Sequence, residues 1–152
     1  MRTSIIYILL LAIAVAMPAH AQDDKHMISV GNFTELSVFD NINVTYRCNP
    51  DSAGKAVISG SQDLIDQLIL QNNQKGKLTV QVSTQLTLTK KQLPTLYVYS
   101  DSLLSASNAG DSTLRLDNVA KVDQLKIVLS DNGKIIAHGL CAPQLLLSIR
   151  TG

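Results

Sequence analysis

The chain has 152 residues, and its 13 Lys and Arg side chains nearly balance its 12 Asp and Glu side chains. Nucleic acid is excluded as an expected partner, because phosphate binding requires clustered positive charge and Lys90-Lys91 is the only basic doublet. Trp is absent and aromatic residues make up 4% of the chain, which argues against a carbohydrate-binding platform of stacked rings.

Residues 1–21 predict a secretory signal peptide. Arg2 supplies the positive start, residues 5–16 form an unbroken apolar run, and Ala19-His20-Ala21 is a small-x-small cleavage pattern. An uncleaved membrane anchor is the weaker alternative, because the run is shorter than the roughly 20 residues that a bilayer span needs. We therefore expect an exported protein, located in the periplasm, on the outer membrane surface or secreted.

After the leader, residues 22–32 predict a flexible lead-in, and residues 33–152 predict one domain. Apolar residues alternate over 33–39 and 42–46, which is typical of strands with one buried face. A third strand is expected at 56–58, after a turn-rich segment over 48–54.

Residues 61–70 predict one short helix, the only one in the mature chain. Ser61 suits an N-cap, and Asp63 suits the first helical turn. Apolar residues at 64, 65, 68 and 69 then fall on one helical face. Strands are expected again at 78–82, weakly at 86–88, and at 96–99, where the short apolar run predicts a buried strand.

The last part of the chain repeats a strand followed by a glycine turn. Gly110, Gly133 and Gly152 lie about twenty residues apart, and alternating apolar strands at 125–129 and 145–149 precede the last two. This spacing favours a β-solenoid, in which equivalent strands stack in parallel rungs. A meander of hairpins is the alternative, but it would favour tighter turns.

The sequence resembles the putative auto-transporter adhesin head domain family (GIN-type) of secreted Bacteroides-like proteins. The resemblance covers residues 33–152 and is carried by 33–47 (FTELSVFDNINVTYR), 49–54 (NPDSAG), 60–66 (GSQDLID) and 96–100 (LYVYS). It implies a right-handed parallel β-helix at the cell surface or in the periplasm, and a binding module for an unknown extracellular ligand, either a glycan or a protein. No site residues come with it.

The residues predict no catalytic, cofactor-binding or metal site. His138 is the one His inside the expected domain, and a metal site needs three or four converging ligands. We therefore expect a non-enzymatic protein. The alternatives are a β-helical carbohydrate-active enzyme that uses Asp-rich rungs, or a purely structural envelope protein. The acidic residues concerned are Asp101, Asp111, Asp117, Asp123 and Asp131, which stand beside turn residues.

Cys48 and Cys141 are the only cysteines, so an exported chain could join them in one disulfide. Two separate thiols are the alternative, because nothing in the sequence places them together.

A separate expectation concerns the C-terminal end of the predicted solenoid. The strand at 145–149 is followed only by Thr151-Gly152, where the resembled family usually runs on through further rungs. An uncovered solenoid end recruits other strands. We therefore expect an incomplete β-helix that either continues beyond Gly152 or self-associates through this end.

Overall fold

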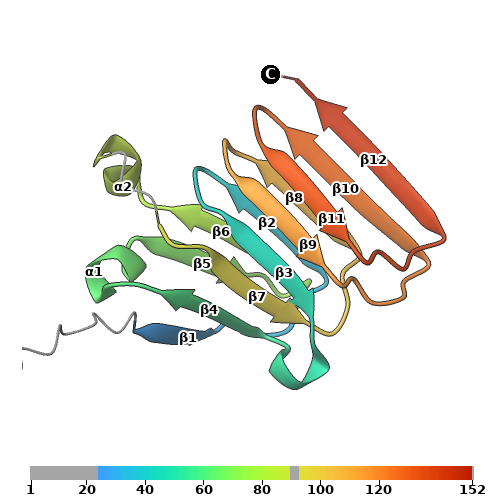
Figure 1. The fold of residues 1–152 in the computed structure, drawn as a ribbon, viewed down its shortest axis with the longest axis horizontal. Helices are drawn as coiled ribbons and strands as arrows, with labels where there is room; N and C mark the ends of the chain where they lie inside the picture. The colour runs from blue at the N-terminus through green and yellow to red at the C-terminus, as the bar shows by residue number, and fades with distance from the viewer. Residues whose placement is uncertain (1–23, 90–92, 152) are drawn as a thin grey trace, which may run out of the picture.

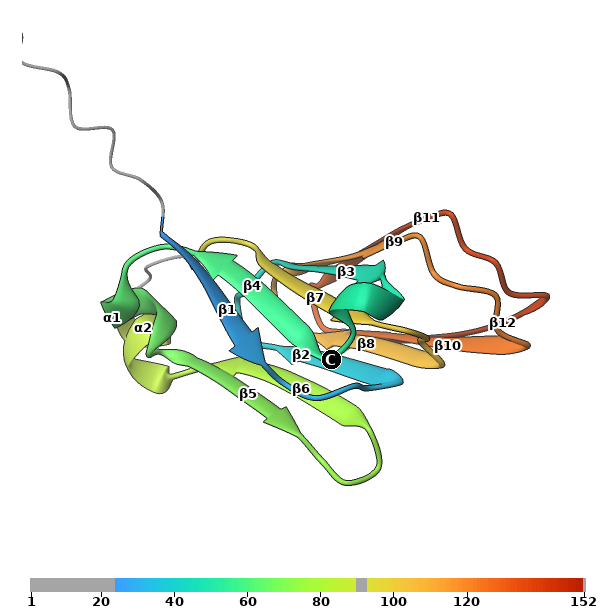
Figure 2. The same cartoon turned by 90° about the horizontal axis from the view of Figure 1, so that it is seen from below.

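The fold is given by a computed structural model that describes residues 24–89 and 93–151 (Figure 1). The predicted signal peptide lies outside the described residues. Within them, twelve strands form two six-stranded sheets. Figure 2 shows the sheets as two layers facing each other. Among the described residues, no helix has the length and apolar character that crossing a membrane would require.

Sheet A has the order β1-β4-β7-β3-β9-β11. Its strands are β1 (Lys25–Ser29), β4 (Lys55–Ser59), β7 (Leu96–Ser100), β3 (Val44–Cys48), β9 (Thr113–Asp117) and β11 (Lys134–His138). Sheet B has the order β12-β10-β8-β2-β6-β5. Its strands are β12 (Gln144–Arg150), β10 (Gln124–Ser130), β8 (Ser105–Ala109), β2 (Glu35–Phe39), β6 (Lys77–Val82) and β5 (Leu68–Asn72).

The predicted right-handed parallel β-helix is wrong. Strands β2, β8, β10 and β12 do pair in parallel, as do β7, β3, β9 and β11. However, β4 is antiparallel to both β1 and β7, and β5 is antiparallel to β6. The result is two mixed sheets without a closed solenoid. Alternation of apolar residues shows which face of a strand is buried. Parallel and antiparallel strands have the same alternation, so the pattern does not distinguish between them.

The helix prediction over 61–70 is also too long. Helix α1 covers only Gln62–Ile65, and the chain re-enters a strand at Leu68. Leu68 and Leu70 pair with Val82 and Val80 of β6, so sheet pairing overrides the helical spacing. A second helix, α2 (Thr84–Thr89), replaces the weak strand expected at 86–88. A 3-10 turn, η1 (Pro50–Ser52), lies in the segment that was expected to turn.

Strand β1 lies within the segment expected to be a flexible lead-in. It pairs antiparallel with β4 at the edge of sheet A. Its residues alternate between exposed and half-buried, with His26 and Ile28 half-buried. A polar segment can form such a strand because only one of its faces needs to contact the core.

The core lies between the two sheets and consists of the inward-facing side chains of both. Phe33 and Tyr46 stack edge to face, with ring centroids 6.2 Å apart. The other large side chains that are fully buried are Leu36, Ile42, Ile58, Leu78, Leu96, Leu103, Leu114, Leu116 and Leu125.

The glycine spacing in the sequence has a structural cause. Turns between successive strand pairs stack on one another, and Gly110 lies directly against the backbone of Asp40, where an added β-carbon would overlap it. A β-carbon at Gly133 would lie 2.5 Å from the carbonyl oxygen of Gly110. Buried Asn108 supports the stack, because its Nδ2 donates hydrogen bonds to the carbonyl oxygens of Ser112 (2.8 Å) and Lys134 (3.1 Å).

Candidate binding face

The outer face of sheet A is the candidate functional site. Alternate side chains of its strands point away from the core, and the strand register aligns them in rows across the sheet. One row reads, strand by strand, Met27, Val57, Tyr97, Thr45, Arg115 and Ile136. The next row reads Ser29, Lys55, Tyr99, Arg47, Asp117 and His138.

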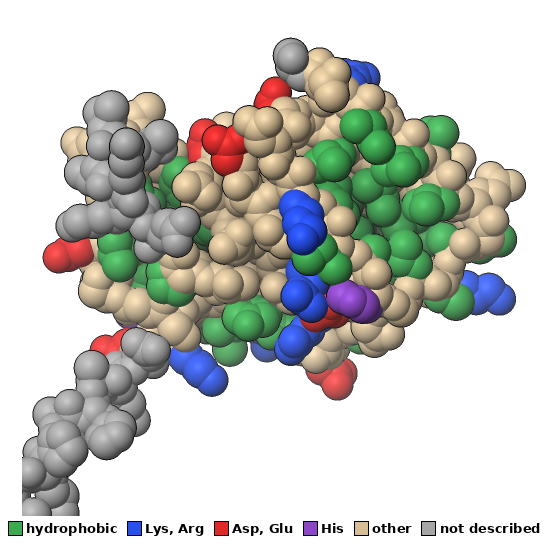
Figure 3. Space-filling model, turned by 45° about the horizontal axis from the view of Figure 1, so that its top comes forward, with side chains coloured by type: hydrophobic (Ala, Val, Ile, Leu, Met, Phe, Trp, Pro, Cys, Tyr) green, Lys and Arg blue, Asp and Glu red, His purple; other side chains and the backbone are tan. Residues whose placement is uncertain are grey.

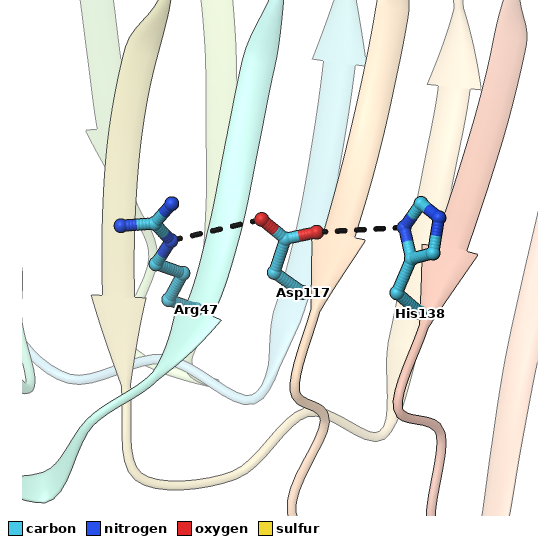
Figure 4. Close-up of polar contacts among 3 residues, drawn as sticks. All are labelled: Arg47, Asp117 and His138. Carbon is cyan, nitrogen blue, oxygen red and sulfur yellow. Dashed lines mark ion pairs between the residues drawn. The ribbon is translucent and has the colours of Figure 1, made fainter.

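Three charged or titratable groups line up in the second row (Figure 4). Arg47 Nε lies 3.7 Å from Asp117 Oδ2, and His138 Nδ1 lies 3.7 Å from Asp117 Oδ1. These distances exceed those of a charge-assisted hydrogen bond, and the Arg47 and His138 side chains are 51% and 61% exposed. Such solvated pairs contribute roughly 0–1 kcal/mol to stability, so these residues are available to a ligand.

An aromatic ring lies next to this row of charged groups. The guanidinium carbon of Arg47 lies 5.4 Å from the centroid of the Tyr97 ring, a cation–π arrangement. Tyr97 and Tyr99 both point outward from β7, while Leu96 and Val98 are buried. Neither tyrosine was predicted as a site residue from the sequence, because 96–99 was expected to be a buried apolar strand. The alternation Leu-Tyr-Val-Tyr was the signal that could have found them.

A recess of about 210 Å³ opens beside the first row. It is lined by Asn43, Val44, Thr45, Thr95, Thr113 and Arg115. The lining therefore combines hydroxyl and amide groups with one guanidinium. Figure 3, a tilted view, shows basic side chains gathered in the middle of the surface.

A second recess, of about 560 Å³, lies away from this face and contains no aromatic residue. Its lining consists of Ser102, Leu104, Lys121, Val122, Asp123, Gln124 and Lys126.

The acidic residues considered for catalysis do not form one set. Asp111 precedes β9 and Asp117 ends it, so their backbones lie roughly 20 Å apart along an extended strand. Asp101 accepts a hydrogen bond from Asn32 Nδ2 at 2.8 Å. Asp111 and Asp131 share a shallow recess at the stacked turns. Among the described residues, no group of three or more His, Cys, Asp and Glu side chains could hold a metal ion.

The two cysteines lie in different surroundings. Cys48 ends β3, and its Sγ donates a hydrogen bond to the carbonyl oxygen of Asp101 at 3.2 Å. Cys141 is exposed in the segment before β12. Both are free thiols in this structure, and their pairing stays a prediction.

A family model for the putative auto-transporter adhesin head GIN domain matches residues 32–152. The chain belongs to this family. The resemblance noted from the sequence is thereby confirmed, and it supports a surface binding protein. Among curated proteins, none matches the sequence.

A solved structure shares the fold of this GIN-domain chain, and a second is reported beside it for comparison. A putative lipid binding protein from Parabacteroides distasonis superposes with a TM-score of 0.55 at 15% identity, covering 82% of this chain and 59% of that one. A putative adhesin from Bacteroides fragilis gives a TM-score of 0.49 at 8% identity, covering 85% of this chain and 96% of that one. The chain thus spans about three fifths of the length of the first.

Proposed function

We propose that this GIN domain is an exported, non-catalytic binding module, and that the outer face of sheet A binds an acidic glycan. The observation that carries the proposal is that Arg115 lines the polar recess and that Tyr97 and Arg47 lie beside it on the same face. Family membership supports a surface binding role. We expect no cofactor and no nucleic acid partner.

The chemistry of the face suits a carboxylated sugar. A planar guanidinium binds a carboxylate through two parallel hydrogen bonds, and Arg115 is exposed at the rim of the recess. The hydroxyls of Thr95 and Thr113 and the Asn43 amide can exchange hydrogen bonds with sugar hydroxyls. The ring of Tyr97, with the Arg47 guanidinium over it, adds apolar surface for contact with a pyranose. The chain has few aromatic residues, but two of them lie on one strand of this face, which is enough for contact with a sugar.

Glycan binding is tested on an array of neutral and acidic glycans with the mature protein. We expect carboxylated glycans to bind, and Arg115→Gln or Tyr97→Ala to weaken the Kd at least tenfold, equivalent to about 1.4 kcal/mol. Lys126→Gln is the matched control, because it removes the same charge from the outer face of sheet B.

If Lys126→Gln and Arg115→Gln weaken glycan binding equally, the outer face of sheet A is not the specific binding site. If the protein binds other proteins but no glycans, the proposed ligand class is wrong. The enzyme alternative needs a parallel assay of reducing-sugar release. Turnover that Asp111→Asn or Asp131→Asn abolishes would defeat the proposal. A structural envelope protein would show neither binding nor turnover.

A further inference from the structure

One carboxylate lies among the basic side chains on the outer face of sheet A. Among the outward-facing strand residues that the structure describes on this face, Asp117 is the only acidic one. The basic ones are Lys25, Lys55, Arg47, Arg115 and Lys134. A carboxylate lowers the affinity of such a face for acidic ligands, so its position indicates which ligands the face excludes.

Asp117 offsets the charge of Arg47. Its Oδ2 lies 3.7 Å from Arg47 Nε, and its Oδ1 lies 3.7 Å from His138 Nδ1 on the other side (Figure 4). The Arg47 guanidinium also lies over the ring of Tyr97, with 5.4 Å between its central carbon and the ring centroid. The pair of Arg47 and Asp117 therefore presents no net charge to a ligand.

Arg115 is the guanidinium that remains to bind a carboxylate. It belongs to neither of these ion pairs, and it is exposed at the rim of the recess. Lys134 of β11 lies opposite Thr113, diagonally across from Arg115, where its long side chain can reach the same ligand group. Asp117 follows Arg115 on the same face of β9, with roughly 7 Å between the two α-carbons.

We propose that Asp117 restricts this face to one carboxylate at a time, so that the ligand is a glycan in which one acidic sugar adjoins neutral sugars. This ligand class rests on the proposed function, since it assumes a glycan at this face. A pyranose unit is close in length to the spacing between strands, about 4.8 Å. A chain that crosses sheet A from β9 toward β7 thus places roughly one sugar over each of β9, β3 and β7.

The three strands offer different groups to these sugars. Over β9, the carboxylate of the acidic sugar meets Arg115. Over β3, a second carboxylate would gain little from Arg47, whose charge is already offset, and it would approach Asp117 itself. Over β7, a third would meet the rings of Tyr97 and Tyr99 and no basic side chain of that strand. Neutral sugars avoid both costs, and their hydroxyls can donate hydrogen bonds to Asp117.

The next basic side chain of the face is distant from Arg115. Lys55 comes from β4, which lies three strand spacings from β9, or roughly 14 Å. A second acidic sugar is therefore matched by a cation only when neutral sugars separate it from the first.

Calorimetric titration with two trisaccharides tests the inference. Sialyllactose carries one carboxylate next to two neutral sugars, and trigalacturonate carries three carboxylates. We expect the wild type to bind sialyllactose more tightly. Asp117→Asn should tighten trigalacturonate binding by about fivefold or more and sialyllactose binding by less than about twofold, because it frees the charge of Arg47 for a second carboxylate. The gain should shrink as the salt concentration rises, since exposed charges are screened.

Two further variants separate this mechanism from a general effect of charge. Asp123→Asn removes the same charge beside the second recess, away from this face, and should change neither affinity. The double variant Asp117→Asn with Arg47→Gln has the net charge of the wild type. It should return trigalacturonate to its wild-type affinity, because the freed cation is gone. Circular dichroism checks that each variant is folded, which we expect because solvated ion pairs contribute little to stability.

Equal tightening of both trisaccharides by Asp117→Asn overturns the inference, as does a gain that persists in the double variant. The proposed glycan face still stands in these cases if Arg115→Gln weakens the binding of carboxylated glycans on the array. If neither trisaccharide binds to the wild type or to Asp117→Asn, the inference fails, and the array with Arg115→Gln decides separately on the proposed function.

Discussion

Tyr46 is a polar side chain inside the hydrophobic core. Its hydroxyl is 3.0 Å from Ser100 Oγ, which also donates a hydrogen bond to the carbonyl oxygen of Ser102 at 2.8 Å. Burial disfavours the phenolate and raises the pKa of Tyr46 from 10.0 to about 12, although the Ser100 hydrogen bond acts in the opposite direction and lowers this pKa. The neutral form is therefore the one that the core accepts.

The raised pKa predicts a loss of stability at high pH. Between pH 10 and about 12 the unfolded chain loses the Tyr46 proton while the folded chain keeps it, so the free energy of unfolding falls as pH rises. Its contribution is complete below pH 10 and declines by at most about 1.4 kcal/mol per pH unit above it. Urea unfolding at pH 8 to 11 should show this decline in the wild type and a smaller one in Tyr46→Phe. Equal declines would contradict the prediction.

Strands β1 and β5 belong to different sheets, and one side chain connects their ends. Asn72 Nδ2 lies 2.9, 3.2 and 3.0 Å from the carbonyl oxygens of Val30, Gly31 and Asn32, which follow β1. We expect Asn72→Ala to lower the free energy of unfolding by about 1 kcal/mol, because the partly buried carbonyl of Val30 and the exposed carbonyls of Gly31 and Asn32 lose their donor. Hydrogen exchange in β1 should also accelerate.

Gln71→Ala is the matched control for this prediction. Gln71 is the neighbouring residue in β5, and it is exposed on the opposite side of the strand. Its removal should change stability by less than about 0.5 kcal/mol. A similar loss in both variants would mean that the strand itself, rather than the Asn72 amide, is responsible.

At the scale of the whole molecule, both sheets share one hydrophobic core. Neither sheet can bury its inner face alone, so we expect one cooperative unfolding transition. The chain has no Trp, so tyrosine fluorescence reports the tertiary structure, with Tyr46 in the core between the sheets. Urea curves from tyrosine fluorescence and from far-UV circular dichroism should coincide. Two separate transitions would show that the mixed N-terminal part and the parallel C-terminal part fold independently.

The sequence by itself determined the family and the inward and outward faces of most strands. Leu36, Val38, Leu125 and Ile127 are buried as their alternation predicts, because period two is a local property of an extended chain. Glycine spacing likewise indicated the stacked turns around Gly110. The helix over 61–70 and the missed strand β1 show the limit of local pattern, since pairing with a neighbour decided both.

Only the tertiary structure decided the direction and order of the strands, and with them the candidate face. Arg47, Asp117 and His138 come from three separate strands, and their alternation predicts only that they point outward. Their alignment depends on which strands pair and in which register, a choice made by the packing of the whole core. Strand direction also explains why the expected solenoid is instead two mixed sheets. Strands β4 and β5 run antiparallel to their neighbours, and the alternation of residues does not indicate strand direction.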